Sequence, residues 1–441
     1  MPASRKEARR KAKQYHRLFI WTSSKYPIFR LDKRRRPLYN SLTNDKKAAI
    51  KMKYPFEQVI NRKGTNSSKW DSADQRFGGT GLLPLSIADM DFAVPAAIVD
   101  RMKQRLEFPI FGYEKLSEEY YAAVVQWMAR KHHYPIDKDW VVYTSDVCAA
   151  LSYAVDALTP EGAEVLVPTP VYHHFFSSIE RMGRIVRAVP LKRDAQGRCT
   201  YDFDALQAAV NEKTAAIMLC SPHNPVGRVW NRDELEQMTE FCLKNRLLVL
   251  DDEIHQDIVF EKEHLVLPSL SAELEQRCVL CTAPSKAFNV AGMKVANIII
   301  PNEKMRKAYQ ACMRKHGAAE PHAMAAPVVV GAYCQSDSWL EEMLIYVKGN
   351  IDYFCEEIEK RVPMLKPVRP EGTYMIWVDF SALNMSPEEI KKFLAGPCKL
   401  AVNQGAIFGP GGEQFARFNL ACPRSIVEEA IRRLECGIST L

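Results

Sequence analysis

Residues 247–255 read Leu-Leu-Val-Leu-Asp-Asp-Glu-Ile-His, an apolar run that ends directly in a cluster of titratable side chains. Short apolar runs without polar alternation are typical of strands that are covered on both faces. Runs of the same kind, each followed by small or polar residues, recur at 140–143, 165–167, 216–219, 278–280 and 297–300. The pattern predicts a buried sheet with polar loops at the ends of its strands.

The segments between these runs predict helices. Residues 233–244 place Leu235, Met238 and Phe241 at helical spacing, and residues 148–158 are rich in alanine and leucine. Strands that alternate with helices form a mostly parallel α/β sheet, and ligands bind beyond the carboxyl ends of its strands. We therefore expect the functional groups among the polar residues that follow the apolar runs.

The pattern changes after Trp339, where a long amphipathic helix is expected at about 340–361. A strand at 373–380 and helices near 387–394 and 426–434 follow it, which predicts a smaller α+β domain. The expected parts of the chain are a basic leader at 1–51, an N-terminal segment at 52–95, a large domain at 96–338 and a small C-terminal domain at 339–441.

The positive charge of the chain is concentrated at one end. Residues 1–51 contain 16 of the 60 Lys and Arg residues but 3 of the 53 Asp and Glu residues, so the rest of the chain is mildly acidic. This leader fits an arm for nucleic acid, anionic lipid or an import receptor. It also fits a disordered or non-native extension upstream of a natural start at Met52. We favour the second interpretation and expect no nucleic-acid partner.

Other features argue against a membrane or secreted protein. No stretch approaches the ~20 consecutive apolar residues of a membrane-spanning helix, and the N-terminus lacks an apolar run of signal-peptide length. The 12 cysteines are spread singly through apolar stretches, which predicts reduced thiols in a cytoplasmic protein. Because no second His or Cys stands at metal-ligand spacing from the cluster at 251–255, we predict no metal.

Three more polar clusters follow other runs. Lys286 comes after the run at 278–280, and a lysine in a partly desolvated cleft has a lowered pKa and acts as nucleophile and base, although most lysines after strands are solvated. Two prolines and a glycine make the loop at 221–228 rigid and fix the Asn224 amide. Residues 144–148 fit either a phosphate seat at a helix N-terminus or simple N-capping. With the carboxylates at 251–253, these groups together fit pyridoxal phosphate.

The residues of these motifs and their order along the chain resemble those of the fold-type I pyridoxal-phosphate enzymes. Within them the chain is similar to the cystathionine β-lyase-type carbon–sulfur lyases of the class I/II aminotransferase superfamily. The resemblance runs from about Met52 to the C-terminus through seven blocks, at 87–92, 111–113, 169–172, 221–228, 252–255, 283–286 and 417–424. It implies a large domain with a seven-stranded, mostly parallel sheet covered by helices, a smaller α+β C-terminal domain, and pyridoxal 5'-phosphate as cofactor.

The resemblance also implies catalytic and substrate-binding residues. Lys286 would form the Schiff base with the cofactor aldehyde and then take the substrate α-proton. Arg417 would clamp the α-carboxylate of a small amino-acid substrate. Tyr113 would reach the cofactor phosphate of the neighbouring subunit, which implies a homodimer with its active site at the subunit interface.

The remaining implied residues contact the cofactor. Asp252 would pair with the pyridine nitrogen, Asn224 would donate to the phenolate oxygen, and Tyr172 would stack on the ring. The phosphate seat and its surroundings would be formed by Ser285, the backbone of Val147 and Cys148, His255 and Lys294.

Two positions depart from the family pattern. Asp146 stands where glycine is usual, and a carboxylate about 4 Å from a phosphate would cost roughly 4 kcal/mol at an effective dielectric constant of about 20. We therefore expect Asp146 to point away from the phosphate, as a helix cap. Lys294 stands where many relatives have arginine, so the positive charge is kept but the fork geometry is lost.

We predict a carbon–sulfur β-lyase that cleaves L-cystathionine or another L-cysteine S-conjugate to pyruvate, ammonia and a thiol. An aminotransferase is the alternative, because the same proton abstraction begins both reactions. A catalytically weak regulatory or binding protein stays open as a third hypothesis, because Asp146 stands in the expected phosphate seat.

Overall fold

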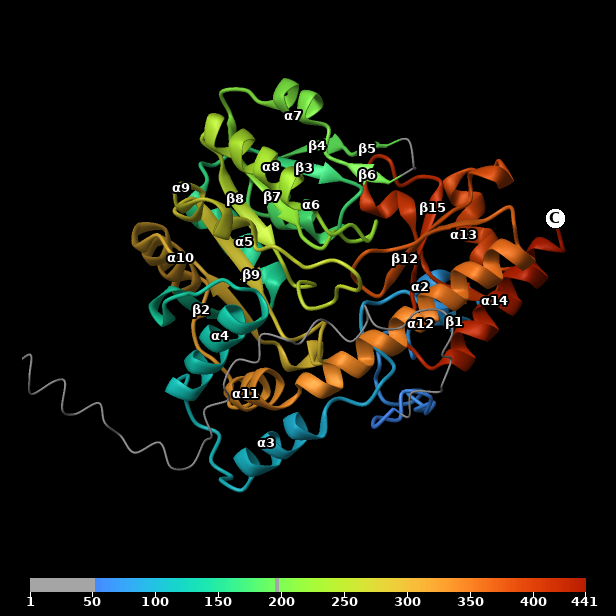
Figure 1. The fold of residues 1–441 in the computed structure, drawn as a ribbon, viewed down its shortest axis with the longest axis horizontal. Helices are drawn as coiled ribbons and strands as arrows, with labels where there is room; N and C mark the ends of the chain where they lie inside the picture. Colours follow the sequence, from blue (N-terminus) through green and yellow to red (C-terminus); the bar gives the residue numbers. More distant parts are fainter. Residues whose placement is uncertain (1–51, 195–197) are drawn as a thin grey trace, which may run out of the picture. The chain divides into compact units, whose positions relative to one another are not determined.

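A seven-stranded sheet forms the centre of the larger part of the fold (Figure 1). In the computed structural model, which describes residues 52–194 and 198–441, its strands follow the order β2 (Val141–Thr144), β10 (Ala296–Ile299), β9 (Cys278–Thr282), β8 (Leu248–Asp252), β7 (Thr214–Cys220), β3 (Glu164–Thr169) and β4 (Ile185–Pro190). β10 runs antiparallel to both of its neighbours, β2 and β9, and all other pairs in this sheet are parallel. The predicted α/β fold is confirmed, whereas the leader at 1–51 lies outside the described residues.

Six of the seven strands coincide with the apolar runs of the sequence, to within about two residues at each end. The seventh, β4, lies at the edge of the sheet and pairs only with β3. Ile185 and Arg187 in this strand stay exposed or half-buried. β4 is covered less than the other strands, including β2 at the opposite edge of the sheet, which is buried throughout, so it lacks the continuous apolar run that marks them.

Helices cover both faces of the sheet. One face is covered by α5 (Val147–Leu158), α6 (His174–Glu180) and α10 (Glu303–Lys315), whose buried side chains form one hydrophobic core with that side of the strands. The second core contains the opposite face together with α3 (Ala96–Leu106), α4 (Glu118–Lys131), α7 (Phe203–Ala209), α8 (Arg232–Lys244), α9 (Ala272–Glu275), α11 (Ala325–Gln335) and α12 (Asp337–Arg361). With both faces covered, the strand ends and loops remain for ligand binding.

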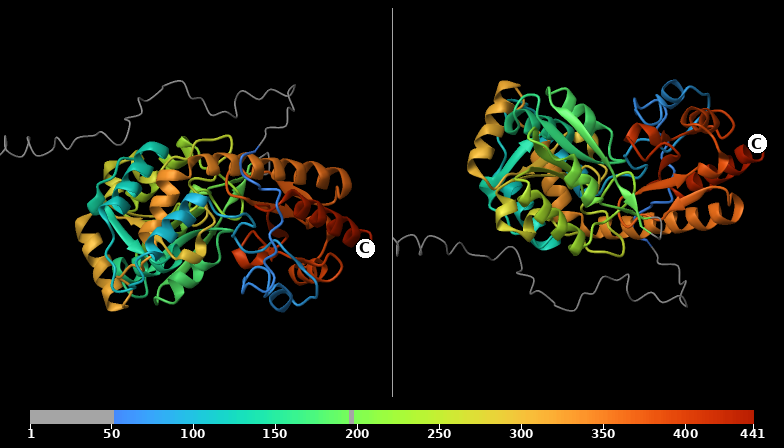
Figure 2. Two further views of the ribbon diagram at one scale, coloured as in Figure 1. Left: turned by 90° about the horizontal axis from the view of Figure 1, so that it is seen from below. Right: turned by 90° about the horizontal axis from the view of Figure 1, so that it is seen from above.

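A four-stranded antiparallel sheet forms the smaller part of the fold. Its order is β11 (Lys366–Val368), β12 (Met375–Asp379), β15 (Phe415–Asn419) and β14 (Asn403–Gln404). The helices α12, α13 (Pro387–Ala395) and α14 (Arg424–Ile438) pack around it, and α12 and α14 lie side by side in both views of Figure 2. The predicted α+β character of this region is confirmed, while the boundaries at 96, 338 and 339 stay predictions.

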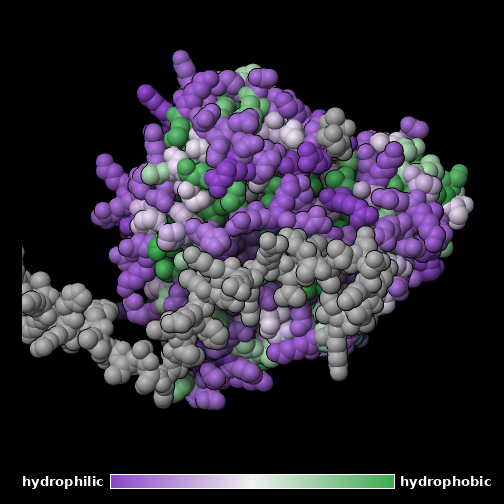
Figure 3. Space-filling view, viewed as in Figure 1, coloured by the Kyte–Doolittle hydropathy of each residue, from purple (hydrophilic) through white to green (hydrophobic). Residues whose placement is uncertain are grey.

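The N-terminal segment joins this smaller part rather than the large sheet. After the short helix α2 (Ala73–Phe77), strand β1 (Leu83–Pro84) pairs in parallel with β13 (Leu400–Ala401). A separate hairpin joins β5 (Lys192–Arg193) to β6 (Cys199–Thr200). The face drawn in Figure 3 is mostly hydrophilic with small separate hydrophobic areas. Within the described ranges, no helix has the length and apolar character needed to cross a membrane.

Candidate active site

A cavity of about 500 Å³ lies at the carboxyl ends of four neighbouring strands of the large sheet. Tyr172 follows β3, Asn224 follows β7, Asp252 ends β8 and Lys286 follows β9. The cavity walls also include five further residues named from the sequence, which are Val147, Cys148, His255, Ser285 and Lys294. Parallel strands bring their carboxyl ends to one edge, which explains why clusters far apart in the chain meet here.

Asp252 supplies a buried carboxylate to this cavity. Its Oδ1 accepts a hydrogen bond from the Ile254 amide at 3.1 Å, and burial raises the pKa of the carboxyl to about 7. The neighbours Asp251 and Glu253 are not among the lining residues. Glu253 instead contacts His264 Nε2 at 2.8 Å. Since side chains alternate along a strand, the acidic cluster seen in the sequence is divided between the two faces of the sheet.

Lys286 supplies an amine to the same cavity. Its Nζ donates to the Ala88 carbonyl at 2.8 Å, and the Tyr374 hydroxyl donates to the same oxygen at 3.0 Å. Burial lowers the pKa of the amine, because removal from water disfavours the charged form. The lysine is therefore held in place by a neutral acceptor and is easier to deprotonate than a solvated lysine.

Arg417 is a buried guanidinium on β15 that approaches the cavity from the smaller sheet. It donates to Asn224 Oδ1 at 2.9 Å, to the Ser86 carbonyl at 2.8 Å and to Asn403 Oδ1 at 3.1 Å. Among the described residues it forms no ion pair with a carboxylate, and burial lowers its pKa to about 10. A buried arginine without a carboxylate is costly, so Arg417 is suited to bind one from a ligand.

The Asn224 side chain has a fixed orientation because arginine can only donate hydrogen bonds. With Oδ1 facing Arg417, the Nδ2 amide is the group left to donate to a ligand. Arg417 itself is not among the residues that line the cavity, in contrast to Asn224. Asn224 therefore contacts the guanidinium and also lines the cavity.

The first turn of α5 lies in the cavity wall, and Asp146 is its N-cap. The Asp146 carboxylate accepts from the Ala149 amide at 2.8 Å through Oδ1, while Oδ2 pairs with Lys294 Nζ at 3.1 Å. The predicted cap is present, but Asp146 also lines the cavity and neutralises the lysine expected to serve a phosphate. Lys294 therefore compensates the unusual carboxylate, and a phosphate bound here would compete with Asp146 for the same cation.

Two aromatic side chains complete the positions named from the sequence. The Tyr172 hydroxyl lies 4.0 Å from Cys148 Sγ, next to the first turn of α5. His255 packs edge-on against Tyr374, with ring centroids 6.0 Å apart. Burial and the nearby charges of Lys286 and Arg417 lower the pKa of this histidine well below its ordinary range. His255 is therefore neutral.

Tyr113 is the one catalytic residue named from the sequence that lies apart from the cavity of its own chain. It stands in the connection between α3 and α4 and is 96% exposed. The structure of one chain therefore does not bring it to the site.

Sequence reasoning missed several groups in this site. The Ala88 carbonyl and Tyr374 position Lys286, and the cavity walls further include Ser152, His174, Ser177, Ser178 and Arg181. Ala88 belongs to the segment at 87–92 that carried part of the resemblance, but nothing local to it signals a contact with a lysine 198 residues away. Helix α6, which contributes His174 and the two serines, carries no motif that the sequence analysis used.

Comparison with known proteins identifies relatives along almost the whole described chain. Residues 80–434 match the family model for aminotransferase class I and II. The chain is 34% identical to cystathionine beta-lyase PatB of Bacillus subtilis (strain 168), over 87% of this chain and 100% of that protein. Protein MalY of Escherichia coli (strain K12) is also 34% identical, over 86% of this chain and 98% of that protein.

A solved structure is similar to the chain over nearly the same residues. The crystal structure of cystalysin from Treponema denticola, which contains a pyridoxal 5'-phosphate cofactor, is 34% identical to the chain with a TM-score of 0.85. The match covers 88% of this chain and 100% of that chain. The resemblance to the carbon–sulfur lyase group, stated from the seven sequence blocks, is confirmed.

Proposed function

The chain belongs to the class I and II aminotransferase family, and within that family we propose that it is a pyridoxal-phosphate-dependent carbon–sulfur β-lyase. Its substrate class is L-cystathionine and other L-cysteine S-conjugates. The observation that carries the proposal is that Asp252 ends β8, Lys286 follows the adjacent strand β9, and both line one cavity. The identity to PatB over that protein's full length supports the same reaction class.

The residues present fit the cofactor. Asp252 has a raised pKa and no cationic partner in an ion pair among the described residues, so it is suited to pair with a protonated pyridine nitrogen. The Asn224 amide would hold the phenolate oxygen, Tyr172 the ring face, and the first turn of α5 with Ser285 the phosphate. When bound, pyridoxal phosphate supplies an electron-accepting ring that stabilises negative charge on the substrate α-carbon.

The protein groups supply orientation and proton transfer. Arg417 binds the α-carboxylate of the amino acid and orients the α-C–H bond, while the rigid Asn224 holds the guanidinium in place. Lys286 takes the α-proton on its neutral amine, which its lowered pKa makes available. Loss of the β-substituent breaks the carbon–sulfur bond; sulfur leaves as a thiol, and hydrolysis of the remaining fragment gives pyruvate and ammonia.

A product assay with L-cystathionine tests the lyase proposal. The full chain loaded with pyridoxal phosphate should form pyruvate and a free thiol in equal amounts with no keto acid added. Pyruvate is measured by a coupled dehydrogenase and the thiol by a colorimetric reagent. If turnover required an added keto acid and produced the matching amino acid, the protein would be an aminotransferase instead.

Replacement of Arg417 by lysine tests the carboxylate clamp. We expect kcat/KM to fall about 10- to 100-fold, because a lysine cannot make the paired hydrogen bonds of a guanidinium to a carboxylate. Arg228→Lys is the matched control, since Arg228 is also buried but pairs with Glu234 and Glu371. Steady-state kinetics that show equal losses for the two variants would contradict this role.

We further propose that the protein is a homodimer in which Tyr113 reaches the phosphate of the neighbouring subunit. The connection between α3 and α4 exposes Phe108, Ile110, Phe111 and Tyr113 together, with Ile110 81% exposed. A cluster of exposed large apolar side chains is typical of a protein interface. A second copy would cover this cluster and bring the tyrosine hydroxyl to a site that its own chain does not reach.

Mixing two impaired variants tests the shared site. Lys286→Ala and Tyr113→Ala should each be impaired as homodimers, whereas a mixed dimer contains one site with both native residues. Refolding an equal mixture should therefore restore about one quarter of the wild-type activity. An activity equal to the mean of the two separate variants would exclude a tyrosine contributed by the neighbour.

We also propose that the protein acts in the cytoplasm. All 12 cysteines are free, and most of them are buried, while Cys334 and Cys436 are exposed. Reduced thiols are typical of that compartment. Separately, we propose that the chain divides into a large domain at 96–338 and a small domain at 339–441.

A further inference from the structure

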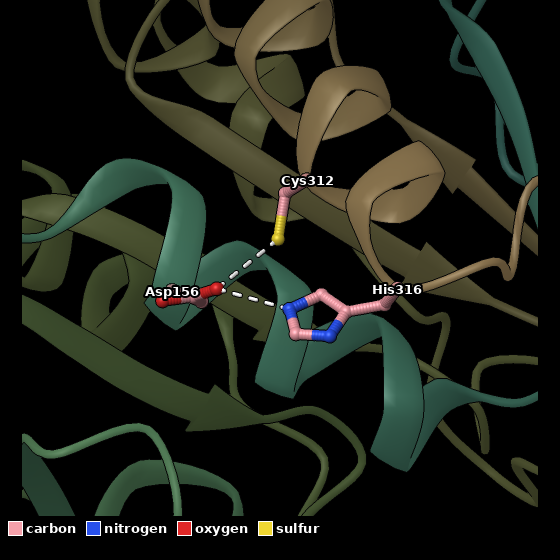
Figure 4. A group of neighbouring side chains, drawn as sticks. All are labelled: Asp156, Cys312 and His316. Atoms are coloured by element: carbon pink, nitrogen blue, oxygen red, sulfur yellow. Dashed lines mark hydrogen bonds and ion pairs between the residues drawn. The ribbon is translucent and has the colours of Figure 1, made fainter.

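Three side chains with metal-binding atoms meet between α5 and α10, away from the cavity described above. Cys312 lies in the last turn of α10, and His316, four residues later, is the C-cap of that helix, where its amide donates to the Cys312 carbonyl at 3.1 Å. Asp156, in the last turn of α5, points toward both of them (Figure 4). One ligand atom from each residue lies within 4.8 Å of the others.

We propose that Asp156, Cys312 and His316 form a binding site for a zinc ion. The set contains one sulfur, one nitrogen and one oxygen ligand, which are the ligand atoms that Zn²⁺ uses in proteins. Thiolate and carboxylate supply two negative charges to the divalent ion, and Arg184 adds one positive charge beside the carboxylate. A water molecule would occupy the fourth position, because a site with three protein ligands leaves one open.

The distances between the ligand atoms fit a tetrahedral site. Asp156 Oδ2 lies 3.4 Å from Cys312 Sγ and 3.2 Å from His316 Nε2. In a regular tetrahedron with ordinary zinc–ligand bonds, the corresponding edges are about 3.6 Å and about 3.4 Å. Both contacts therefore need to open by only about 0.2 Å. The sulfur and nitrogen ligand atoms lie within 4.8 Å of each other, and the His316 side chain, which is 38% exposed, would have to rotate to bring them to a tetrahedral edge.

The surroundings hold the ligands in orientation. Arg184 contacts the other carboxylate oxygen, Asp156 Oδ1, at 3.4 Å, and its guanidinium is also bound by backbone carbonyls of Asp156 and Thr159. This leaves Oδ2 for the ion, as outer partners do in known metal sites. The His316 ring stacks on Tyr153 at a centroid distance of 5.6 Å. Exposure of the histidine gives the ion a path from solvent.

Binding would release the Cys312 thiol proton to solvent as the sulfur–zinc bond forms. The ion would then join the last turn of α5 to α10. Because the first turn of α5 lies in the wall of the candidate active site, zinc would stabilise a helix that the cofactor also needs. The site does not depend on the proposed lyase activity, so it can be tested separately.

The test titrates the full, cofactor-loaded chain with Zn²⁺ by calorimetry and with Co²⁺ by absorbance. We expect one tightly bound equivalent, a thiolate-to-cobalt charge-transfer band and a higher Tm with zinc. His316→Ala and Cys312→Ser should each weaken binding by at least about 10- to 100-fold, the loss seen even for outer partners of metal ligands. The charge-transfer band should be absent in Cys312→Ser.

Matched controls keep the test decisive. Cys436→Ser removes an exposed cysteine outside the proposed site, His133→Asn removes another exposed histidine, and both variants should bind like the native chain. His316→Ala removes a partly exposed side chain, and circular dichroism reports whether it folds. If the native chain gives no charge-transfer band, or if His316→Ala and Cys312→Ser bind as tightly as the controls, the zinc site is excluded.

Discussion

Replacement of Lys286 by alanine is expected to lower kcat/KM for an L-cysteine S-conjugate by at least about 10³-fold, because general-base catalysis alone contributes about 10²- to 10⁴-fold. The same change removes the amine that would bind the cofactor aldehyde. The cofactor absorbance of the loaded protein, at the boundary between the ultraviolet and the visible range, should therefore change as well. The second lysine in the cavity wall, Lys294, cannot substitute, because it is paired with Asp146.

Lys294→Ala is the matched control for this loss. Its side chain is 62% exposed, so we expect weaker cofactor binding but a rate at saturating cofactor within about tenfold of the native protein, since it moves no proton in the reaction. A Lys286→Ala variant that kept activity within tenfold would remove the basis of the proposed mechanism. A colourless native protein that bound partners without turnover would favour a regulatory role.

Replacement of Asp252 by asparagine should reduce kcat about 10³-fold. The carboxylate and a protonated pyridine nitrogen form a charge pair worth roughly 4 kcal/mol at an effective dielectric constant of about 20, which corresponds to about 10³ in rate. Asparagine keeps the shape of the side chain but loses the charge. The substrate carboxylate is bound elsewhere, so KM should change much less than kcat, as steady-state kinetics can show.

Asp251→Asn provides a control at the adjacent position of the same strand. Burial and the neighbouring Glu253 raise the pKa of Asp251 well above its ordinary range, and its side chain does not line the cavity. Asparagine in its place should leave kcat nearly unchanged. Equal losses in the two variants would show that the effect is structural and would contradict the assigned role of Asp252.

Asp252 also gives the cofactor-free chain a pH-dependent stability of definite sign. Its pKa is raised from 3.8 to about 7 by burial, so between these values the native state keeps a proton that the unfolded state has lost. The free energy of unfolding therefore falls as pH rises through this range, by at most about 4 kcal/mol. Urea denaturation should show a weaker decline for Asp252→Asn than for the native chain.

The sequence predicted the main sheet because each covered strand carries its own apolar run. The runs at 216–219, 247–250 and 278–280 correspond to β7, β8 and β9. These strands are neighbours in the sheet in the same order as along the chain, so the polar residues that follow them meet at one sheet edge. Lys286, Asp252 and Asn224 were found because they lie in the polar segments that follow those runs. Of the strands in the main sheet, only β4 was not predicted, because exposed positions interrupt its apolar pattern.

The contacts between side chains from distant parts of the chain were decided by the tertiary structure alone. The pairing of Asp146 with Lys294, the contact of Arg417 with Asn224 and the group of Asp156 with Cys312 and His316 each join residues more than 145 positions apart. Local patterns record which face of a strand or helix is covered, because burial acts on each element separately. They do not record which polar side chains meet, because that depends on how whole elements pack against one another.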